Sequence, residues 1–158
     1  MFPKYILAPH VPTPEDVVDR MLRLGAVTSE DVVYDLGCGD GRVVIAAARQ
    51  FGARGVGVDI EPHWIEESRR NAEHAGVIGL VTFHLQDALT VDLSPASVVM
   101  LYLVEWSTSK LEANIRAGVK PGTRVVSHNY GMTDWTPSKS ETFVDAGGTA
   151  RRLHLWIG

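Results

Sequence analysis

A glycine-rich turn after an apolar run constrains this chain more than any other segment does. The run is residues 32–36 (VVYDL); Gly37, Gly39 and Gly41 follow at alternate positions, and a helix-forming stretch spans 43–50. Glycine is needed where a strand turns sharply into a helix with its backbone against a ligand, because it has no side chain to collide and tolerates positive φ. The segment therefore predicts a strand, a ligand-binding turn and a helix in succession.

The residues around the turn favour S-adenosylmethionine over a dinucleotide. Arg42 stands where the third glycine of the dinucleotide fingerprint G-x-G-x-x-G would fall. Asp35 puts a carboxylate at the end of the strand, where it would repel a pyrophosphate and attract the amino group of a cationic ligand. A glycine turn without a ligand is the alternative. The residues expected to contact the cofactor here are Asp35, Gly37, Cys38, Gly39 and Gly41.

Two more carboxylates follow the next predicted strands. Asp59 ends the strand at 55–59, and Asp87 follows the strand at 80–85. Ligands of an open parallel sheet bind outside the carboxyl ends of its strands, at the switch point of the strand order. We therefore expect Asp59 to accept hydrogen bonds from the ribose hydroxyls and Asp87 to accept one from the adenine amino group. The remaining expected cofactor residues are Ala88, whose N–H would donate to the adenine ring, Ile60, and Trp64, for which core packing is the alternative.

Strand and helix signals alternate along most of the chain. Predicted strands lie at 32–36, 55–59, 80–85, 97–103 and 123–129, and predicted helices at 14–25, 41–51, 62–75 and 110–118. Such alternation predicts a doubly wound sheet, and residues 141–144 and 151–157 flank a Gly-Gly pair as an antiparallel hairpin. The predicted fold class is α/β: a three-layer, doubly wound, Rossmann-like sheet, seven-stranded and mostly parallel, with an antiparallel C-terminal hairpin strand.

The start of the chain is expected to belong to the same unit. Thr13 is the predicted N-cap of the first helix, Pro14 its first residue and Asp16 its capping-box acid. We expect one domain over residues 1–158, with residues 1–25 contributing to the substrate and cofactor cleft.

Charge and cysteine content exclude several classes of function. The net charge of −4 over 158 residues argues against a surface that neutralises nucleic-acid phosphates. A single cysteine, Cys38, excludes an internal disulfide and a multi-cysteine metal site, and its place in the turn predicts a small filler. No segment approaches the roughly 20 apolar residues of a membrane helix, and the start lacks a secretory signal. We expect a cytoplasmic monomer with neither metal, nucleic-acid partner nor membrane insertion.

Aromatic and polar residues after the fourth and fifth predicted strands are candidates for the methyl-acceptor side. Together they would form an aromatic wall; for Trp135 core packing is the alternative. They are Tyr102, Glu105 and Trp106 after the fourth strand, His128, Asn129 and Tyr130 at the end of the fifth, and Trp135 in the following loop. No Asn-Pro-Pro-Tyr run follows the fourth strand, which argues against methylation of an amide or a nucleobase nitrogen.

Four segments resemble the small archaeal protein lysine methyltransferases and their mitochondrial relatives. They are residues 10–18 (HVPTPEDVV), 33–42 (VYDLGCGDGR), 120–128 (KPGTRVVSH) and 135–137 (WTP). The resemblance extends from about residue 10 to residue 157 and implies a class I fold, S-adenosylmethionine as cofactor, and exposed lysines of proteins as methyl acceptors. The chain departs from the family's usual residues at His10, at 103–110 and at 128–130.

If lysine is the acceptor, the reaction is an in-line displacement on the sulfonium methyl. The catalytic residues expected are Tyr102, Glu105 and His10, with Glu105 or His10 accepting the lysine proton or orienting the amine; a solvent-facing loop is the alternative for His10. A small-molecule methyltransferase, with His10, Tyr102, Trp106 and Trp135 closing an aromatic pocket, remains open. So does a non-catalytic accessory protein, against which the intact turn and the three acids argue.

Overall fold

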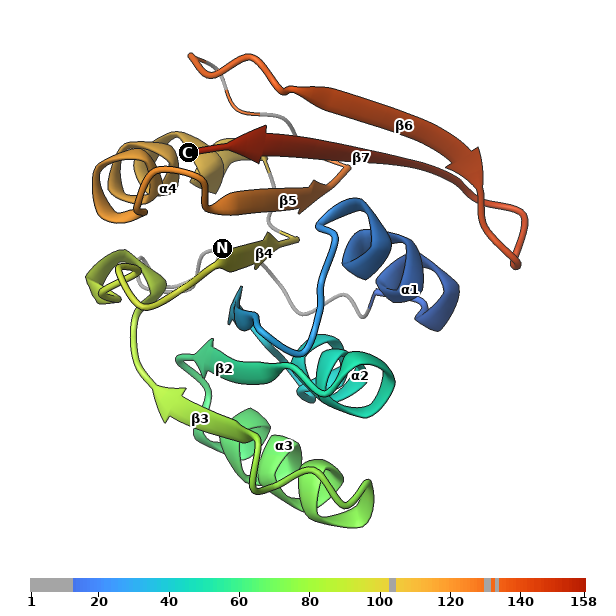
Figure 1. The fold of residues 1–158 in the computed structure, drawn as a ribbon. Coiled ribbons are helices and arrows are strands. Elements are labelled where there is room, and N and C mark those ends of the chain that lie inside the picture. The colour runs from blue at the N-terminus through green and yellow to red at the C-terminus, as the bar shows by residue number, and fades with distance from the viewer. Residues whose placement is uncertain (1–12, 103–104, 130–131, 133) are drawn as a thin grey trace.

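The computed structural model describes residues 13–102, 105–129, 132 and 134–158, with the backbone alone for 105–110. The helices are α1 (Glu15–Leu24), α2 (Arg42–Phe51), α3 (Pro62–His74), α4 (Glu105–Gly118) and the short 3-10 helix η1 (Ala88–Thr90). The strands are β1 (Val32–Leu36), β2 (Arg54–Asp59), β3 (Val81–Leu85), β4 (Val98–Leu101), β5 (Arg124–His128), β6 (Lys139–Val144) and β7 (Ala150–Ile157) (Figure 1).

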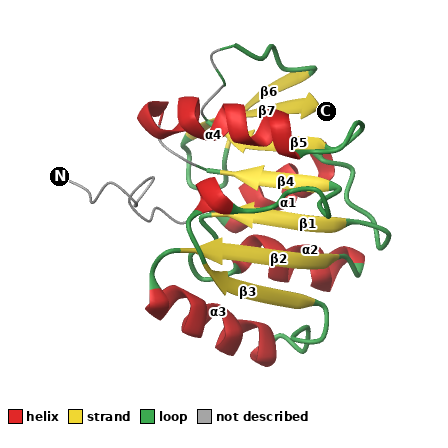
Figure 2. Cartoon of the chain, turned by 90° about the vertical axis from the view of Figure 1, so that its left-hand side faces the viewer, coloured by secondary structure: helices red, strands yellow, loops and turns green. Residues whose placement is uncertain are grey.

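The strands form one sheet in the order β3-β2-β1-β4-β5-β7-β6. Strands β1 to β5 run parallel, whereas β7 lies antiparallel between β5 and β6 (Figure 2). The predicted fold class is therefore confirmed. The order reverses between β1 and β4, and the carboxyl ends of these two strands are where an open sheet of this kind binds its ligand.

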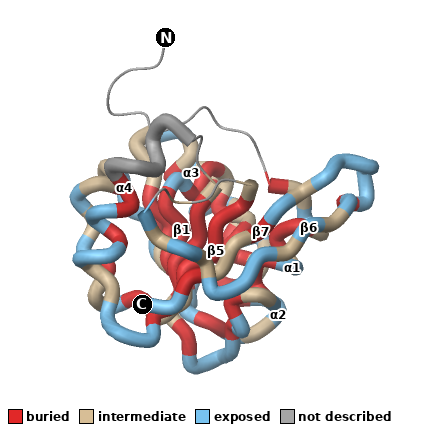
Figure 3. Tube along the Cα trace, turned by 90° about the horizontal axis from the view of Figure 1, so that it is seen from above, coloured by how far each residue is buried: buried red, intermediate tan, exposed pale blue. Residues whose placement is uncertain are grey.

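Each face of the sheet carries its own hydrophobic core. Successive side chains of a strand point to opposite faces, so Val33, Met100 and Val126 pack with α1, α2 and α3. Tyr34 and Leu101 instead join the core under α4. Figure 1 shows α4 across the sheet from α1 and α2, and Figure 3 shows the buried strands β1 and β5 inside the outer helices. Both faces are covered, which explains why β4 is entirely apolar and buried.

Two local predictions about helices are wrong. Helix α1 has Pro14 as its N-cap without a side-chain cap, because Asp16 accepts a hydrogen bond from the Ala146 N–H (2.8 Å) and Thr13 approaches His128. Helix α4 begins at Glu105, five residues before the predicted start. Serine and threonine at 107–109 are weak helix formers in the absence of tertiary contacts, which is why the pattern predicted a later start.

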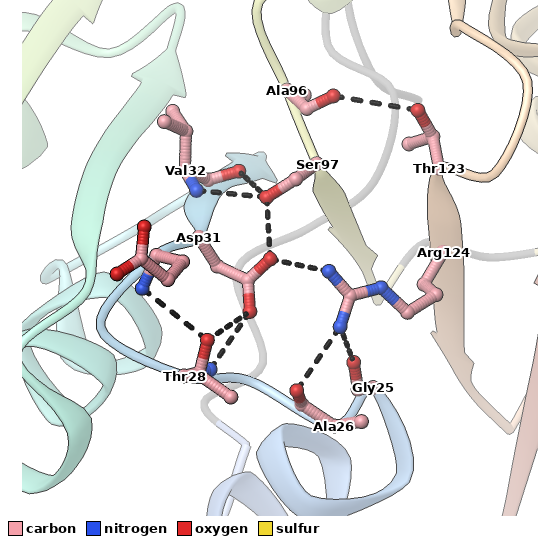
Figure 4. Close-up of polar contacts among 10 residues, drawn as sticks. Gly25, Ala26, Thr28, Asp31, Val32, Ala96, Ser97, Thr123 and Arg124 are labelled. Atoms are coloured by element: carbon pink, nitrogen blue, oxygen red, sulfur yellow. Dashed lines mark hydrogen bonds and ion pairs between the residues drawn. The ribbon is translucent and has the colours of Figure 1, made fainter.

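A buried ion pair fastens β1, β4 and β5 at the edge of the sheet opposite the switch point. Asp31, just before β1, is paired with Arg124 at the start of β5 and accepts a hydrogen bond from Ser97 (2.7 Å) (Figure 4). Arg124 also donates to the carbonyls of Gly25 (2.8 Å) and Ala26 (3.0 Å) at the end of α1. The amino ends of three strands and the end of α1 are thereby fixed together.

Candidate active site

The glycine turn is held against the tip of β2 by backbone hydrogen bonds. Gly37, Gly39 and Gly41 have φ values of 83°, 54° and 85°, in the left-handed region that favours glycine. The N–H groups of Gly37 and Cys38 both donate to the Val58 carbonyl, at 2.8 and 2.9 Å. Gly37 itself is exposed. The turn is therefore fixed from behind and has an open backbone position where a ligand can approach closely.

Side chains of α2 and α3 hold the other side of the turn. Ser68 donates to the Gly39 carbonyl (2.7 Å), and Asn71 donates to the Asp40 carbonyl (2.9 Å). Asp40 accepts the backbone N–H of Arg42 (3.2 Å) and forms an ion pair with its guanidinium (2.6 Å). The predicted capping role of Asp40 and the predicted pairing of Arg42 with a nearby acid are both confirmed.

Asp59 links the turn to the position expected for a ribose. Its Oδ2 accepts the N–H of Gly39 (3.0 Å), and its Oδ1 accepts the N–H of Glu61 (3.0 Å). An ionised carboxylate has roughly four acceptor positions, so two backbone donors leave room for two hydroxyl groups. The half-buried side chain can therefore bind a diol while it holds the turn.

Asp35 is a buried carboxylate that lacks a compensating partner. Its side chain is 6% exposed and makes no hydrogen bond to any residue that the structure describes. Burial, together with the carboxylates of Asp59 and Asp40, raises the pKa of Asp35 well above its usual range. A cation beside it would remove this penalty, so the site fits the α-amino group of S-adenosylmethionine.

The adenine side of the candidate site lies at the carboxyl end of β3. Asp87 caps η1 by accepting the Leu89 N–H at its Oδ1 (2.9 Å), and Ala88 is buried beneath it. Trp64 is half-buried, with its ring centroid 4.6 Å from that of His63. The structure thus brings Asp35, Asp59 and Asp87 to the tips of three adjacent strands, with the half-buried Ile60 directly after Asp59.

Cys38 has no features of a nucleophile. The side chain is 4% exposed, and burial together with Asp35 and Asp59 raises the pKa of its thiol. Only the thiolate is nucleophilic. Cys38 is thus a buried filler that packs beneath Gly57.

The acceptor-side candidates divide into three groups. Tyr102 is half-buried at the end of β4, and its ring centroid lies 3.9 Å from that of the fully buried His128 at the end of β5. Asn129 follows with a left-handed backbone (φ 68°). The side chains of Glu105 and Trp106 lie outside the described residues, although their backbone forms the start of α4. His10 and Tyr130 also lie outside the described residues.

Trp135 does not belong to the acceptor wall. Its carbonyl accepts the indole N–H of Trp156 (2.7 Å), and its ring lies 5.3 Å from the guanidinium carbon of Arg116 on α4. It also lines a surface hollow with Pro121 and Ile157, at the amino end of β5. The core-packing alternative for Trp135 is therefore correct, because the loop that carries it crosses the α4 face of the sheet.

Sequence reasoning missed two charged residues beside His128. Arg151 on β7 lies with its Nη1 3.3 Å from the His128 Nε2, and Asp145 pairs with Arg151 at 2.7 Å. Leu153 is the register partner of His128, and Arg151 lies two residues away on the same face. No local pattern marks these residues, because antiparallel pairing over 23 positions of sequence brings them to the site.

A mostly parallel sheet with this order, whose switch point carries a glycine turn and an uncompensated acid, defines a class I S-adenosylmethionine-dependent methyltransferase. The family model described as the ANTKMT methyltransferase domain matches residues 35–139. The chain belongs to this family.

Three similar proteins illustrate the range of relatives. A protein-lysine N-methyltransferase of Saccharolobus islandicus is 41% identical over 94% of this chain and 92% of that protein. A mouse ATP synthase lysine N-methyltransferase is 32% identical over 84% of this chain, which spans 53% of the mouse protein. The crystal structure of an RNA methyltransferase from Salinibacter ruber in complex with S-adenosyl-L-homocysteine has a TM-score of 0.86 and 47% identity, over 93% of both chains.

None of the helices among the described residues has the length and apolar character needed to span a membrane.

Proposed function

We propose that this methyltransferase transfers a methyl group to the side-chain amine of lysine in proteins. The observation that carries the proposal is the near full-length similarity to the Saccharolobus islandicus protein-lysine N-methyltransferase. The similarity to the mouse lysine N-methyltransferase supports the same acceptor class. A net charge of −4 favours attraction of a basic protein segment over binding to a phosphate backbone.

Three carboxylates are proposed to hold the cofactor. Asp35 would pair with its amino group, Asp59 would accept both ribose hydroxyls, and Asp87 would accept the adenine amino group beside the Ala88 N–H. The bound cofactor supplies an activated methyl on a cationic sulfur. The glycine turn, which Asp59, Ser68 and Asn71 hold rigidly, would fix the direction of this methyl without reorganisation.

The chain's remaining task is to deliver a neutral amine. Deprotonating lysine at pH 7 costs about 4.6 kcal/mol from its reference pKa of about 10.4. Desolvation beside a positive charge lowers this cost, because both penalise the ammonium form. Tyr102 is proposed to contact the acceptor, with Glu105 and His10 as candidates to take the proton. Alignment of the amine with the methyl is worth up to about 7–11 kcal/mol.

Two other acceptor classes compete with lysine. The Salinibacter ruber protein is called an RNA methyltransferase, but the sequence carries neither a positive net charge nor the Asn-Pro-Pro-Tyr run associated with nucleobase nitrogens. A small-molecule acceptor would need an enclosed aromatic pocket. Trp135, one of its four expected members, lies on the α4 face of the sheet. Both observations favour lysine.

The experiment separates the three acceptor classes in one reaction. The purified protein is incubated with cell extract and S-adenosylmethionine carrying a labelled methyl group, and the products are divided by protease, ribonuclease and ultrafiltration. We expect protease-sensitive label that acid hydrolysis releases as methyllysine, with none from the matched Asp59→Ala variant. Label that only ribonuclease releases, or that passes the filter untreated, would reject the lysine proposal.

The cellular setting follows from the same proposal. We propose a cytoplasmic enzyme that acts as a monomer on protein segments with exposed lysines, without a nucleic-acid partner. Size-exclusion chromatography with light scattering tests the monomer directly.

A further inference from the structure

A chain of polar contacts crosses the acceptor side of the molecule through His128. The imidazole is 0% exposed, its Nε2 lies 3.3 Å from the Arg151 Nη1, and its Nδ1 lies 3.5 Å from the Thr13 Oγ1. Arg151 is in turn paired with the buried Asp145. These contacts thus join the end of β5 to β7, to the turn after β6 and to the segment that precedes α1.

These contacts fix the protonation and the tautomer of the imidazole. A guanidinium can only donate, so the Nε2 of His128 accepts and its Nδ1 carries the proton, which faces the Thr13 hydroxyl. Burial and the adjacent Arg151 lower the pKa of His128 to about 4, against a smaller opposing effect of Asp145. Because Arg151 and Asp145 neutralise each other, the imidazole stays neutral and in one orientation over the physiological range.

The face of this fixed ring supports Tyr102. The two ring centroids are 3.9 Å apart and the planes are tilted by 32°, the kind of offset contact that aromatic pairs favour. Tyr102 follows Leu101, whose register partner Leu36 directly precedes the glycine turn. Tyr102 therefore lies beside the switch point, with His128 behind it.

The same set of contacts reaches the cofactor side. The Thr13 carbonyl accepts a hydrogen bond from the Arg42 Nη1 (2.9 Å), and the rest of the Arg42 guanidinium holds Asp40 in the glycine turn. Thr13 is 7% exposed. One residue thus contacts both the support of Tyr102 and the arginine that fixes the turn.

We propose that His128 is a positioning residue, which acts through Tyr102 to hold the methyl acceptor in line with the cofactor, and that Thr13 couples this support to the glycine turn. The inference rests on the proposed placement of the acceptor beside Tyr102. Since His128 is buried, it acts on the acceptor only through the ring in front of it. Loss of the imidazole is therefore expected to affect acceptor use far more than cofactor binding.

A double-mutant cycle tests the proposal on a short lysine peptide, with kcat, KM and cofactor Kd measured for each protein. We expect His128→Ala to lower kcat/KM for the peptide about 10-fold or more, while the cofactor Kd changes by less than about 3-fold. In a Tyr102→Ala background the same substitution should change kcat/KM by less than about 2-fold. His128→Phe keeps a ring behind Tyr102 and should recover part of the loss.

The matched control is His154→Ala. His154 lies one residue from Leu153 on β7, on the opposite face, and contacts the Ser140 hydroxyl at the surface. It should leave kcat/KM unchanged. If His128→Ala does not fold, Thr13→Val removes only the hydrogen bond to Nδ1 and should raise the peptide KM with an unchanged cofactor Kd.

The outcomes distinguish this proposal from the proposed function. Independent, additive effects of His128→Ala and Tyr102→Ala, or a lowered melting temperature with unaltered kcat/KM, would overturn the positioning role. A wild-type protein that methylates no lysine peptide rejects the lysine acceptor instead. The cycle is then measured on whichever fraction of the extract takes the label, and the same two results decide the role of His128.

Discussion

The Oδ2 of Asp59 accepts the N–H of Gly39 at 3.0 Å, so the tip of β2 and the glycine turn after β1 move as one unit. The turn is fastened a second time where Gly37 and Cys38 donate to the Val58 carbonyl, one residue before Asp59. A side chain that binds the ribose would therefore also set the geometry of the turn. Cofactor affinity and turn geometry depend on the same carboxylate.

Replacing Asp59 is expected to abolish tight cofactor binding. Hydrogen bonds to a charged acceptor are worth about 1.5–3 kcal/mol each, so loss of two ribose contacts in Asp59→Ala should weaken binding about 100-fold or more. Asp59→Asn keeps one acceptor oxygen and should lose less. Titration calorimetry with S-adenosyl-L-homocysteine measures both variants. Equal affinity of wild type and Asp59→Ala would remove Asp59 from the site.

Asp35 is expected to couple cofactor binding to proton release. Its pKa is raised in the folded protein by burial and by its acidic neighbours, and an ammonium group beside it would favour the ionised form. Affinity should therefore rise with pH until the raised pKa is passed. Calorimetry in two buffers of different ionisation enthalpy measures the protons released on binding. An enthalpy independent of the buffer at every pH would contradict the pairing.

The same carboxyl group lowers the stability of the ligand-free protein. A folded pKa above the unfolded value of about 3.8 means that stability falls as pH rises from that value through the folded pKa. Asp35→Asn should raise the unfolding free energy at neutral pH by about 0.5–2 kcal/mol and weaken cofactor binding at least about 10-fold. Thermal unfolding at pH 4 and pH 7 checks the first effect; the variant's advantage should be larger at pH 7.

The fold and the cofactor side could be predicted because their signals are local. A glycine turn, an acid at the tip of a strand and the alternation of strands and helices all depend on residues close in sequence. The strand ends differ from the prediction by no more than two residues, and the apolar run after Leu101 accounts for the largest error. The capping box failed for the opposite reason, because Thr13 and Asp16 find partners more than one hundred positions away.

The acceptor side could not be predicted in the same way. Arg151 reaches His128 only through strand register, and Trp135 lies on the far face because its loop crosses behind β5. Neither relationship has a periodic signature. The Thr-Arg pair of the family-like segment 120–128 also proves to be structural, since Arg124 fastens the amino edge of the sheet. Segments typical of a family therefore mark fold as well as function.

Gly57 is expected to be intolerant of a side chain. A Cβ at this position would lie 2.7 Å from the Phe83 Cδ1 and 3.0 Å from the Cys38 Cβ, so the β2 tip and the turn would have to separate. Gly57→Ala should cost about 1–3 kcal/mol of unfolding free energy and weaken cofactor binding. Gly79→Ala is the control, because its Cβ would meet nothing within 4 Å. Denaturant unfolding compares them, and equal stability of the two variants would refute the contact.

The ion pair between Asp31 and Arg124 is expected to support stability without affecting methyl transfer. Burial raises the pKa of Asp31, but hydrogen bonds from Ser97, Thr28 and Arg124 outweigh it and lower the pKa below its usual value. The pair therefore stabilises the fold above a pH of about 3.8, and this contribution is lost as pH falls through the lowered pKa.

Arg124→Met leaves the Asp31 carboxylate buried without its cation, for which a loss of about 3–5 kcal/mol is expected. Arg23→Met is the matched control: Arg23 pairs with Asp19 at 2.9 Å, but its side chain is 73% exposed, so the change should stay within about 0.5 kcal/mol. Below the temperature at which Arg124→Met unfolds, its kcat/KM should equal that of wild type, because the pair lies at the opposite edge from the glycine turn. A fall in kcat/KM at full native population would show instead that the amino edge of the sheet controls the site.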